Sequence, residues 1–292
     1  MSVSYASRIV LAALLCTCAL RAQAAITCQV TSTGFTAVYS ETIATANDTT
    51  GSYTVTCTRG LTSDPITFAY TLRANDGLNA NAPPTNRAAA PGGGVNRINY
   101  ELYRTAAGTG PWNNTTATAF AGTVIFGTTT TMSASDSKPF YARIPALQNV
   151  KASTFTDTVT MSLLNSVGTT VDTDTLAVTI INTTSCQFTT PPGTMTFNYT
   201  SFQTTAATAN TPYSVRCTSG VSYTPSLSAT GGTLLNLPYT LTLSNPATVS
   251  ANGLPQNYTI NGSIAAGLSG TCAGPAAVIC TGQQPRTLTI TY

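Results

Sequence analysis

Two stretches of this chain carry nearly the same pattern: Cys28-Gln29-Val30, closing on Tyr53-Thr54-Val55-Thr56-Cys57-Thr58-Arg59-Gly60, and Cys186-Gln187-Phe188, closing on Tyr213-Ser214-Val215-Arg216-Cys217-Thr218-Ser219-Gly220. Both open on Cys-Gln and an apolar residue, and both close on Tyr-x-Val-x-Cys-Thr-x-Gly. A repeat of this size is too long for a solenoid unit and indicates two related domains in tandem. A chain of 292 residues can hold both. We expect one domain at 25–182 and the other at 183–292.

The first 24 residues have the features of a secretory signal. Arg8 supplies positive charge, Ile9–Leu20 is apolar, and Ala22-Gln23-Ala24 is a small-x-small cleavage site. No later apolar run approaches the roughly 18–20 residues that a membrane-spanning helix needs. The sequence therefore predicts a signal peptide at 1–24 and an exported mature chain.

The cysteines predict a disulfide framework. The chain has eight, and Cys16 and Cys18 leave with the signal, so an even number reaches an oxidising compartment. The repeat favours two pairs, which leaves a third near the C-terminus: Cys28–Cys57, Cys186–Cys217 and Cys272–Cys280. Without His or Cys-x-x-Cys, we expect no metal site and no cofactor.

The charge pattern argues against several classes of function. Charged residues make up 7% of the chain, and removing Arg8 and Arg21 from the formal +3 leaves about +1, too little for nucleic-acid binding. Residues 185–292 contain no Asp or Glu, which fits a protein in contact with other subunits or a surface. With no His and no Gly-x-Ser-x-Gly motif, we expect no catalytic residues and no enzyme activity.

Alternation with a period of two residues predicts the fold class. Tyr53, Val55 and Cys57 alternate with threonines, and the same period recurs at 98–103, 158–163 and 287–292. Short runs of this kind separated by Gly, Pro, Asn and Ser are typical of β-sandwiches. We therefore expect an all-β chain with two tandem immunoglobulin-like sandwiches.

Further motifs resemble a known family. Besides the cysteine pairs, they are Asn99-Tyr100-Glu101-Leu102-Tyr103 leading to Trp112, then Tyr141 to Gln148, then Thr156-Asp157-Thr158-Val159. In this order they resemble the spore coat protein U domain, whose members are mostly secreted subunits of archaic chaperone–usher pili in Gram-negative bacteria. The resemblance covers nearly all of domain 1 and parts of domain 2. Asn113 and Ser153 depart from the usual pattern.

The resemblance implies pilin-type sandwiches that lack one strand. A chaperone strand fills the gap, and the N-terminal extension of the next subunit then replaces it. Only Ala25–Thr27 precede Cys28, so we expect this chain to donate no strand. The strand Thr175–Ile181, with Leu176, Val178 and Ile180, is expected to complete domain 1 in cis. Domain 2 would be the acceptor, its groove bounded by a last strand with Leu288, Ile290 and Tyr292.

This layout implies a two-domain pilus tip subunit that attaches to abiotic or host surfaces and promotes biofilm formation. Its expected partners are a periplasmic chaperone, an outer-membrane usher and the next pilin, and its expected place is the cell surface, reached through the periplasm. Two alternatives stay open. One is a tip initiator without adhesive function, and the other is a secreted coat protein whose two domains are both self-complete.

Candidate surface-binding residues come mainly from the long loop between Asn75 and Asn96, because long loops are often functional or mobile. A disordered surface loop is an equally good interpretation. Trp112 could be an exposed anchor, although a structural role is favoured, and the turn around Leu147 is more readily structural than binding. The candidates are Pro83, Pro84, Ala88, Ala89, Ala90, Pro91, Val95, Trp112 and Leu147.

Overall fold

The computed structural model describes residues 26–80, 87–91, 96–106, 108–270 and 282–292, and its strands confirm the all-β prediction. One three-residue 3-10 helix, η2 (Thr116–Thr118), is the exception among the described elements. The strands of the first half are β1 (Thr27–Ser32), β2 (Phe35–Tyr39), β3 (Asn47–Thr58), β4 (Thr67–Ala74), β5 (Arg87–Ala89), β6 (Ile98–Tyr103), β7 (Phe120–Ile125), β8 (Ser133–Ile144), β9 (Ser153–Asn165) and β10 (Thr170–Asn182). Those of the second half are β11 (Cys186–Thr190), β12 (Ala207–Cys217), β13 (Ser222–Leu227), β14 (Gly231–Leu234), β15 (Leu237–Leu243), β16 (Val249–Ser250), β17 (Gln256–Ile264) and β18 (Leu288–Thr291).

The first half is a sandwich of two five-stranded sheets. Their strand orders are β1-β3-β8-β6-β5 and β2-β10-β9-β4-β7. One hydrophobic cluster draws residues from both sheets, including Tyr53 and Phe140 from one and Leu72 and Val159 from the other. The alternating pattern of the sequence explains this packing, because successive side chains of a strand point to opposite faces.

The second half repeats the plan with fewer paired strands. It has a five-stranded sheet, β11-β12-β17-β15-β14, and a three-stranded sheet, β16-β13-β18. A separate hydrophobic cluster fills it, with Tyr213, Val215 and Tyr223 at its centre. Each half thus has its own core.

The predicted disulfides of the repeat are present and equivalent. Cys28 lies directly opposite Cys57 on β1 and β3, and Cys186 lies directly opposite Cys217 on β11 and β12. Both pairs are bonded. The predicted Cys272–Cys280 pair lies outside the described residues.

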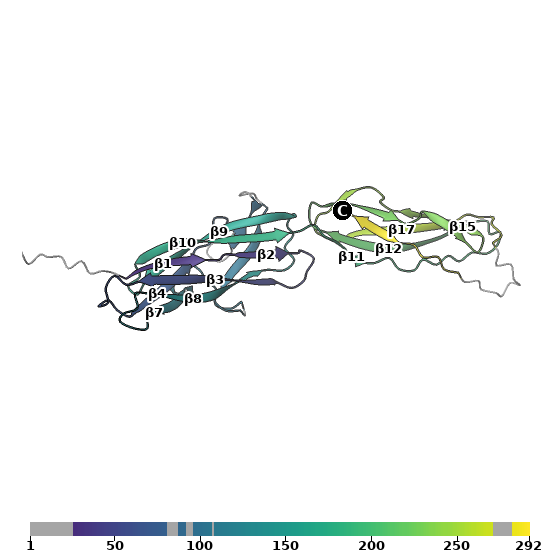
Figure 1. Cartoon of the computed structure of the whole chain (residues 1–292). Helices are drawn as coiled ribbons and strands as arrows, with labels where there is room; N and C mark the ends of the chain where they lie inside the picture. The colour runs from purple at the N-terminus through teal and green to yellow at the C-terminus, as the bar shows by residue number, and fades with distance from the viewer. Residues whose placement is uncertain (1–25, 81–86, 92–95, 107, 271–281) are drawn as a thin grey trace, which may run out of the picture.

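The two halves lie end to end (Figure 1). They meet where β10 ends and β11 begins, and the strands β3, β9 and β10 run along the length of the first half. The loops at 59–66, 126–132 and 165–169 join the strand ends that lie farthest from the second half, because β1 pairs with β3 at Thr58 and β4 pairs with β9 at Asn165. These three loops are called the distal loops below.

Candidate functional site

Strand β10 lies inside the first half, between two other strands of the same chain. It pairs antiparallel with β9 and parallel with β2. Its inward residues Leu176, Val178 and Ile180 are at most 1% exposed and belong to the main cluster. The strand predicted at Thr175–Ile181 is therefore present, begins earlier than predicted, and covers the core of the first half.

Strand β18 takes the place of β9 in the second half. In the first half, β9 pairs with β4, with Leu163 opposite Leu72. In the second half, β18 pairs with β13, with Ile290 opposite Pro225. In both halves this strand comes after a long strand of the other sheet: β9 after β8 in the first half, and β18 after β17 in the second. Within the described ranges no strand pairs with the other edge of β18, where β9 has β10.

The segment after β11 corresponds to β2 but is not paired as a strand. It spans residues 191–204, and every second residue of its middle part, Met195, Phe197 and Tyr199, packs partly buried against the second cluster. Gly262 of β17 makes room for this packing, because a Cβ at that position would collide with Phe197 and Met195. The alternation is that of a strand, so the segment has the side-chain pattern of β2 without its ladder.

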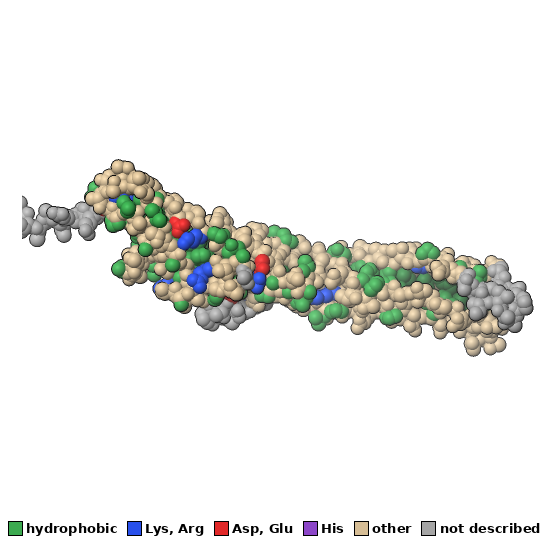
Figure 2. Space-filling view, turned by 90° about the horizontal axis from the view of Figure 1, so that it is seen from below, with side chains coloured by type: hydrophobic (Ala, Val, Ile, Leu, Met, Phe, Trp, Pro, Cys, Tyr) green, Lys and Arg blue, Asp and Glu red, His purple; other side chains and the backbone are tan. Residues whose placement is uncertain are grey.

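The core between β18 and residues 195–199 is less covered than its counterpart. Leu288 and Ile290 are half-buried, whereas Val159 and Met161 of β9 are fully buried. Tyr292 is 58% exposed. Figure 2 shows hydrophobic side chains in a recess of the second half. An apolar edge with free backbone groups is the arrangement that an added strand requires. We call this strip, bounded by β18 and residues 195–199, the β18 groove.

The distal loops carry exposed apolar side chains. Leu61 and Ile66 are 49% and 42% exposed, and Val167 at the tip of the β9–β10 hairpin is 82% exposed. Ile125, the last residue of β7 next to the loop at 126–132, is 64% exposed. Large exposed aliphatic residues gathered at one end of a protein mark an interaction site more often than scattered ones do.

A buried guanidinium holds two distal loops together. Arg59 is 1% exposed and donates to carbonyl oxygens of both loops: those of Thr62, Asp64, Thr128, Thr129 and Thr131. Its guanidinium also lies 5.5 Å from the centre of the Phe126 ring. Arg59 has the planar, multiply donating group that such a set of acceptors needs. Sequence reasoning missed this residue, because nothing local distinguishes it from a solvated arginine.

Three of the predicted surface-binding residues are buried, which corrects the prediction. Trp112 is fully buried, donates its Nε1 hydrogen to the carbonyl of Leu72 at 2.9 Å, and packs its ring against Phe120 and Phe140. Ala89 and Ala90 are at most 1% exposed. A side chain without exposed surface cannot contact an external surface.

The two alanines are buried because hydrogen bonds and strand pairing fix the loop at 75–96 to the sandwich. The buried carboxylate of Asp157 accepts hydrogen bonds from the backbone of Leu78 and Asn79 and from the hydroxyl of Tyr100. β5, within this loop, pairs with β6, and Ala90 forms a bridge with Thr156.

The other predicted binding residues fall in different places. Pro91 is half-buried, and Ala88 lies in β5 opposite Asn99. Leu147 is 51% exposed with a φ of 58°, but it lies beside the segment that contacts the second half. Pro83, Pro84 and Val95 lie outside the described residues. The candidates within the described ranges therefore do not form one surface.

Tyrosines form the main polar clusters of both cores. In the second half, the hydroxyls of Tyr223 and Tyr258 lie 2.6 Å apart, and burial raises the pKa of Tyr213 to about 12. In the first half, burial and the bond to the Asp136 carboxylate raise the pKa of Tyr70. These groups stay neutral over the physiological range, so the clusters are structural hydrogen-bonding elements.

No helix in the described part of the chain is long and apolar enough to cross a membrane. No group of three or more His, Cys, Asp or Glu residues within the described ranges is placed to hold a metal ion.

Comparison with solved structures gives distant matches. The CupB6 tip adhesin from Pseudomonas aeruginosa is 8% identical, with a TM-score of 0.38 over 91% of this chain and 94% of that chain. The CooA pilin subunit from enterotoxigenic Escherichia coli is 9% identical, with a TM-score of 0.33 over 54% of this chain and 97% of that chain. TM-scores this low do not establish a common arrangement of strands. No curated protein matches the chain.

Comparison with family models gives one match, which lies in the first half. The model described as Spore Coat Protein U domain matches residues 14–162. The matched range contains the first cysteine pair, Trp112 and Asp157. Because this match spans half of the chain, the chain belongs to the Spore Coat Protein U domain family.

Proposed function

We propose that the protein is a tip subunit of a chaperone–usher pilus, with domains at 25–182 and 183–292. The first domain is completed by its own β10 and points outward. The second accepts a strand from another protein at the β18 groove. The observation that carries this proposal is the contrast between β9, which is covered by β10, and β18, which has no second neighbour among the described strands.

The donor strand would occupy the position in the second half that β10 occupies in the first half. It would run antiparallel to β18 and parallel to residues 195–199, as β10 runs to β9 and β2. Alternate apolar side chains would cover Leu288, Ile290 and Phe197. Burial at roughly 25 cal/mol per Å² of apolar surface would drive the addition, and backbone hydrogen bonds would fix its register.

Family membership supports the expected partners and route. A signal peptide at 1–24 would direct the chain to the periplasm, where a chaperone would supply the first complementing strand. An outer-membrane usher would then exchange it for the extension of the next pilin. The near absence of charge from the second half is consistent with a domain buried in a fibre, since self-association is favoured at low net charge.

The distal loops are the proposed adhesive surface, in place of the loop at 75–96. They lie at the end of the first half farthest from the second half, and the exposed residues Leu61, Ile66 and Val167 of these loops, with Ile125 at the end of β7, are aliphatic. Such a surface suits apolar abiotic materials or apolar patches on host surfaces. Attachment through it would support biofilm formation.

A peptide with the sequence of residues 170–182 tests the acceptor site. Because this sequence fills the equivalent position in the first half, we expect it to bind the full chain and to slow hydrogen exchange at 288–291. A matched peptide with Asp in place of Val178 and Ile180 is the control, and it should have no effect.

The two other functions predict different results. A coat protein with two complete domains would show protected 288–291 amides without any peptide. A non-adhesive initiator would bind the peptide but would show no loss of attachment when the distal loops are altered.

A further inference from the structure

One buried carboxylate lies at the contact between the two halves. Glu41 belongs to the first half and is 0% exposed, and its Oε1 accepts a hydrogen bond of 3.0 Å from the backbone N–H of Ser219 in the second half. Two further contacts surround it. Asn149 Nδ2 donates to the carbonyl of Asn252 at 2.8 Å, and Lys151 forms a parallel bridge with Ser219. We call this contact the joint.

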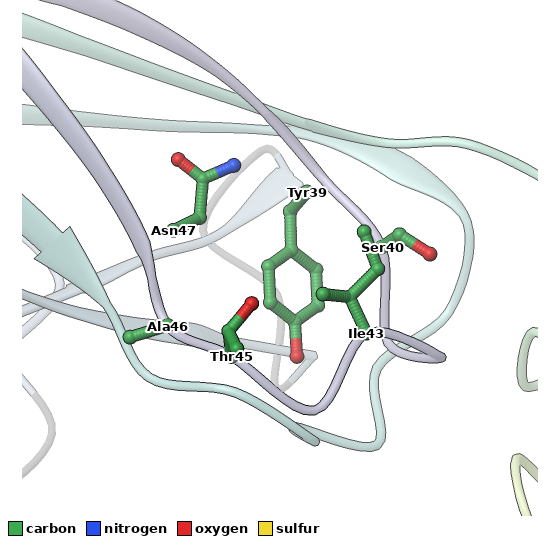
Figure 3. Close-up of a pocket in the computed structure, with 6 residues that line it drawn as sticks. All are labelled: Tyr39, Ser40, Ile43, Thr45, Ala46 and Asn47. Atoms are coloured by element: carbon green, nitrogen blue, oxygen red, sulfur yellow. The ribbon is translucent and has the colours of Figure 1, made fainter.

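The turn that carries Glu41 is fixed to the first half by a hydrogen bond of Tyr39. It follows Tyr39 at the end of β2, and the hydroxyl of Tyr39 accepts a hydrogen bond of 2.7 Å from the backbone N–H of Gln148. Figure 3 shows the Tyr39 ring surrounded by residues of the turn, among them Ser40, Ile43 and Thr45, at a cavity of about 140 Å³. Glu41 therefore lies on a turn between β2 and β3 that is packed against the first half.

The second oxygen of Glu41 has no partner. Oε2 is buried and accepts no hydrogen bond in the described structure. No ion pair joins Glu41 to a Lys or Arg among the described residues. The charged groups of the joint are Arg216, whose Nε donates to the carbonyl of Gly253, and Lys151, whose backbone bridges Ser219.

A carboxylate in this position favours its neutral form. Burial raises the pKa of Glu41, and the N–H groups of Ser219 and Val150 and the charge of Arg216 offset this only in part. When the halves separate, the side chain meets water, and its pKa returns toward the ordinary value of about 4.3. The docked form therefore binds a proton more tightly than the separated form does.

We propose that the joint is proton-dependent: the halves dock firmly when Glu41 is neutral and loosen when Glu41 ionises. The direction follows from linkage. A group whose pKa is higher in the docked form favours docking below its ordinary pKa, and this contribution is lost as the pH rises through the docked pKa. The joint thus stiffens on acidification from neutral pH. This proposal does not depend on the β18 groove or on adhesion.

Hydrogen exchange of the full chain between pH 4.5 and 7.5 tests the proposal, after correction for the intrinsic pH dependence of exchange. We expect peptides covering 39–43 and 218–221 to lose protection as the pH rises. In Glu41→Gln, a permanently neutral side chain of the same shape, protection in these peptides should not change with pH. Asp48→Asn is the matched control, because the Asp48 carboxylate is 48% exposed and paired with Arg143 of the first half, and this variant should keep the wild-type profile.

Two results would overturn the proposal. One is wild-type protection at 39–43 and 218–221 that is independent of pH. The other is a pH profile in Glu41→Gln that follows the wild type. Peptides from the cores of both halves provide a reference, because their protection should stay constant in all three proteins while the joint changes.

Discussion

Truncating Ile180 to alanine tests whether β10 is an integral part of the first half. Ile180 is fully buried, lies opposite Phe155 on β9 and Ala37 on β2, and so contacts the core from between two strands. Truncating a buried Ile to Ala costs about 2–5 kcal/mol. Because this site is enclosed on both sides, we expect about 3 kcal/mol. For a domain of this size, that lowers the melting temperature by about 6–12 °C.

The only tryptophan of the chain provides the assay. Trp112 lies in the core of the first half, so its fluorescence follows the unfolding of that half within the intact protein. Thr175→Ala is the matched control, because Thr175 lies on the same strand but is exposed, and we expect a change within about 0.5 kcal/mol. If Ile180→Ala melts within 1 °C of the wild type, β10 does not complete the first half and the reasoning is refuted.

Three further predictions concern the distal loops and the second core. Arg59→Ala should destabilise the first half by about 2–3 kcal/mol, because carbonyl oxygens of two loops lose a charged donor. Trp112 fluorescence melts would check this, and an unchanged melting temperature would contradict it. Leu61→Asp combined with Val167→Asp should reduce attachment to polystyrene at unchanged piliation, whereas Leu147→Asp should not; equal loss in both would count against the distal surface. Tyr213 should titrate near pH 12 in the folded protein, and its contribution to stability should be lost as the pH rises from about 10 to 12, as absorbance at 295 nm would show.

Much of the fold could be predicted because its signals are local or repeated. The two cysteine pairs fall directly opposite each other on neighbouring strands, and the repeat alone indicated both pairings. The strand with Leu176, Val178 and Ile180 was predicted as the segment that completes the first half in cis, and its side chains alternate between buried and exposed positions. Alternation reports which faces are buried, which is the information that a sandwich strand carries.

The candidate surface could not be predicted, because it depends on which loops share an end of the molecule. Loop length drew attention to residues 75–96, but the distant carboxylate of Asp157 fixes the start of that loop. The three distal loops are short, so loop length did not indicate them, although strand order places them together at the distal end. Arg59 and Glu41 are buried charged residues, and partners such as Thr129 and Ser219 lie far from them in the sequence, so no local pattern predicts these contacts.

Separate expression of the two halves tests the central claim most directly. Residues 25–182 and 183–292 would be produced in a periplasm, with and without the cognate chaperone, and followed by thermal melting. We predict that 25–182 melts cooperatively alone, while 183–292 is recovered folded only with the chaperone or a donor peptide. If 183–292 melts cooperatively alone, the β18 groove needs no added strand, and the proposed pilus subunit is contradicted in favour of a self-complete secreted coat protein.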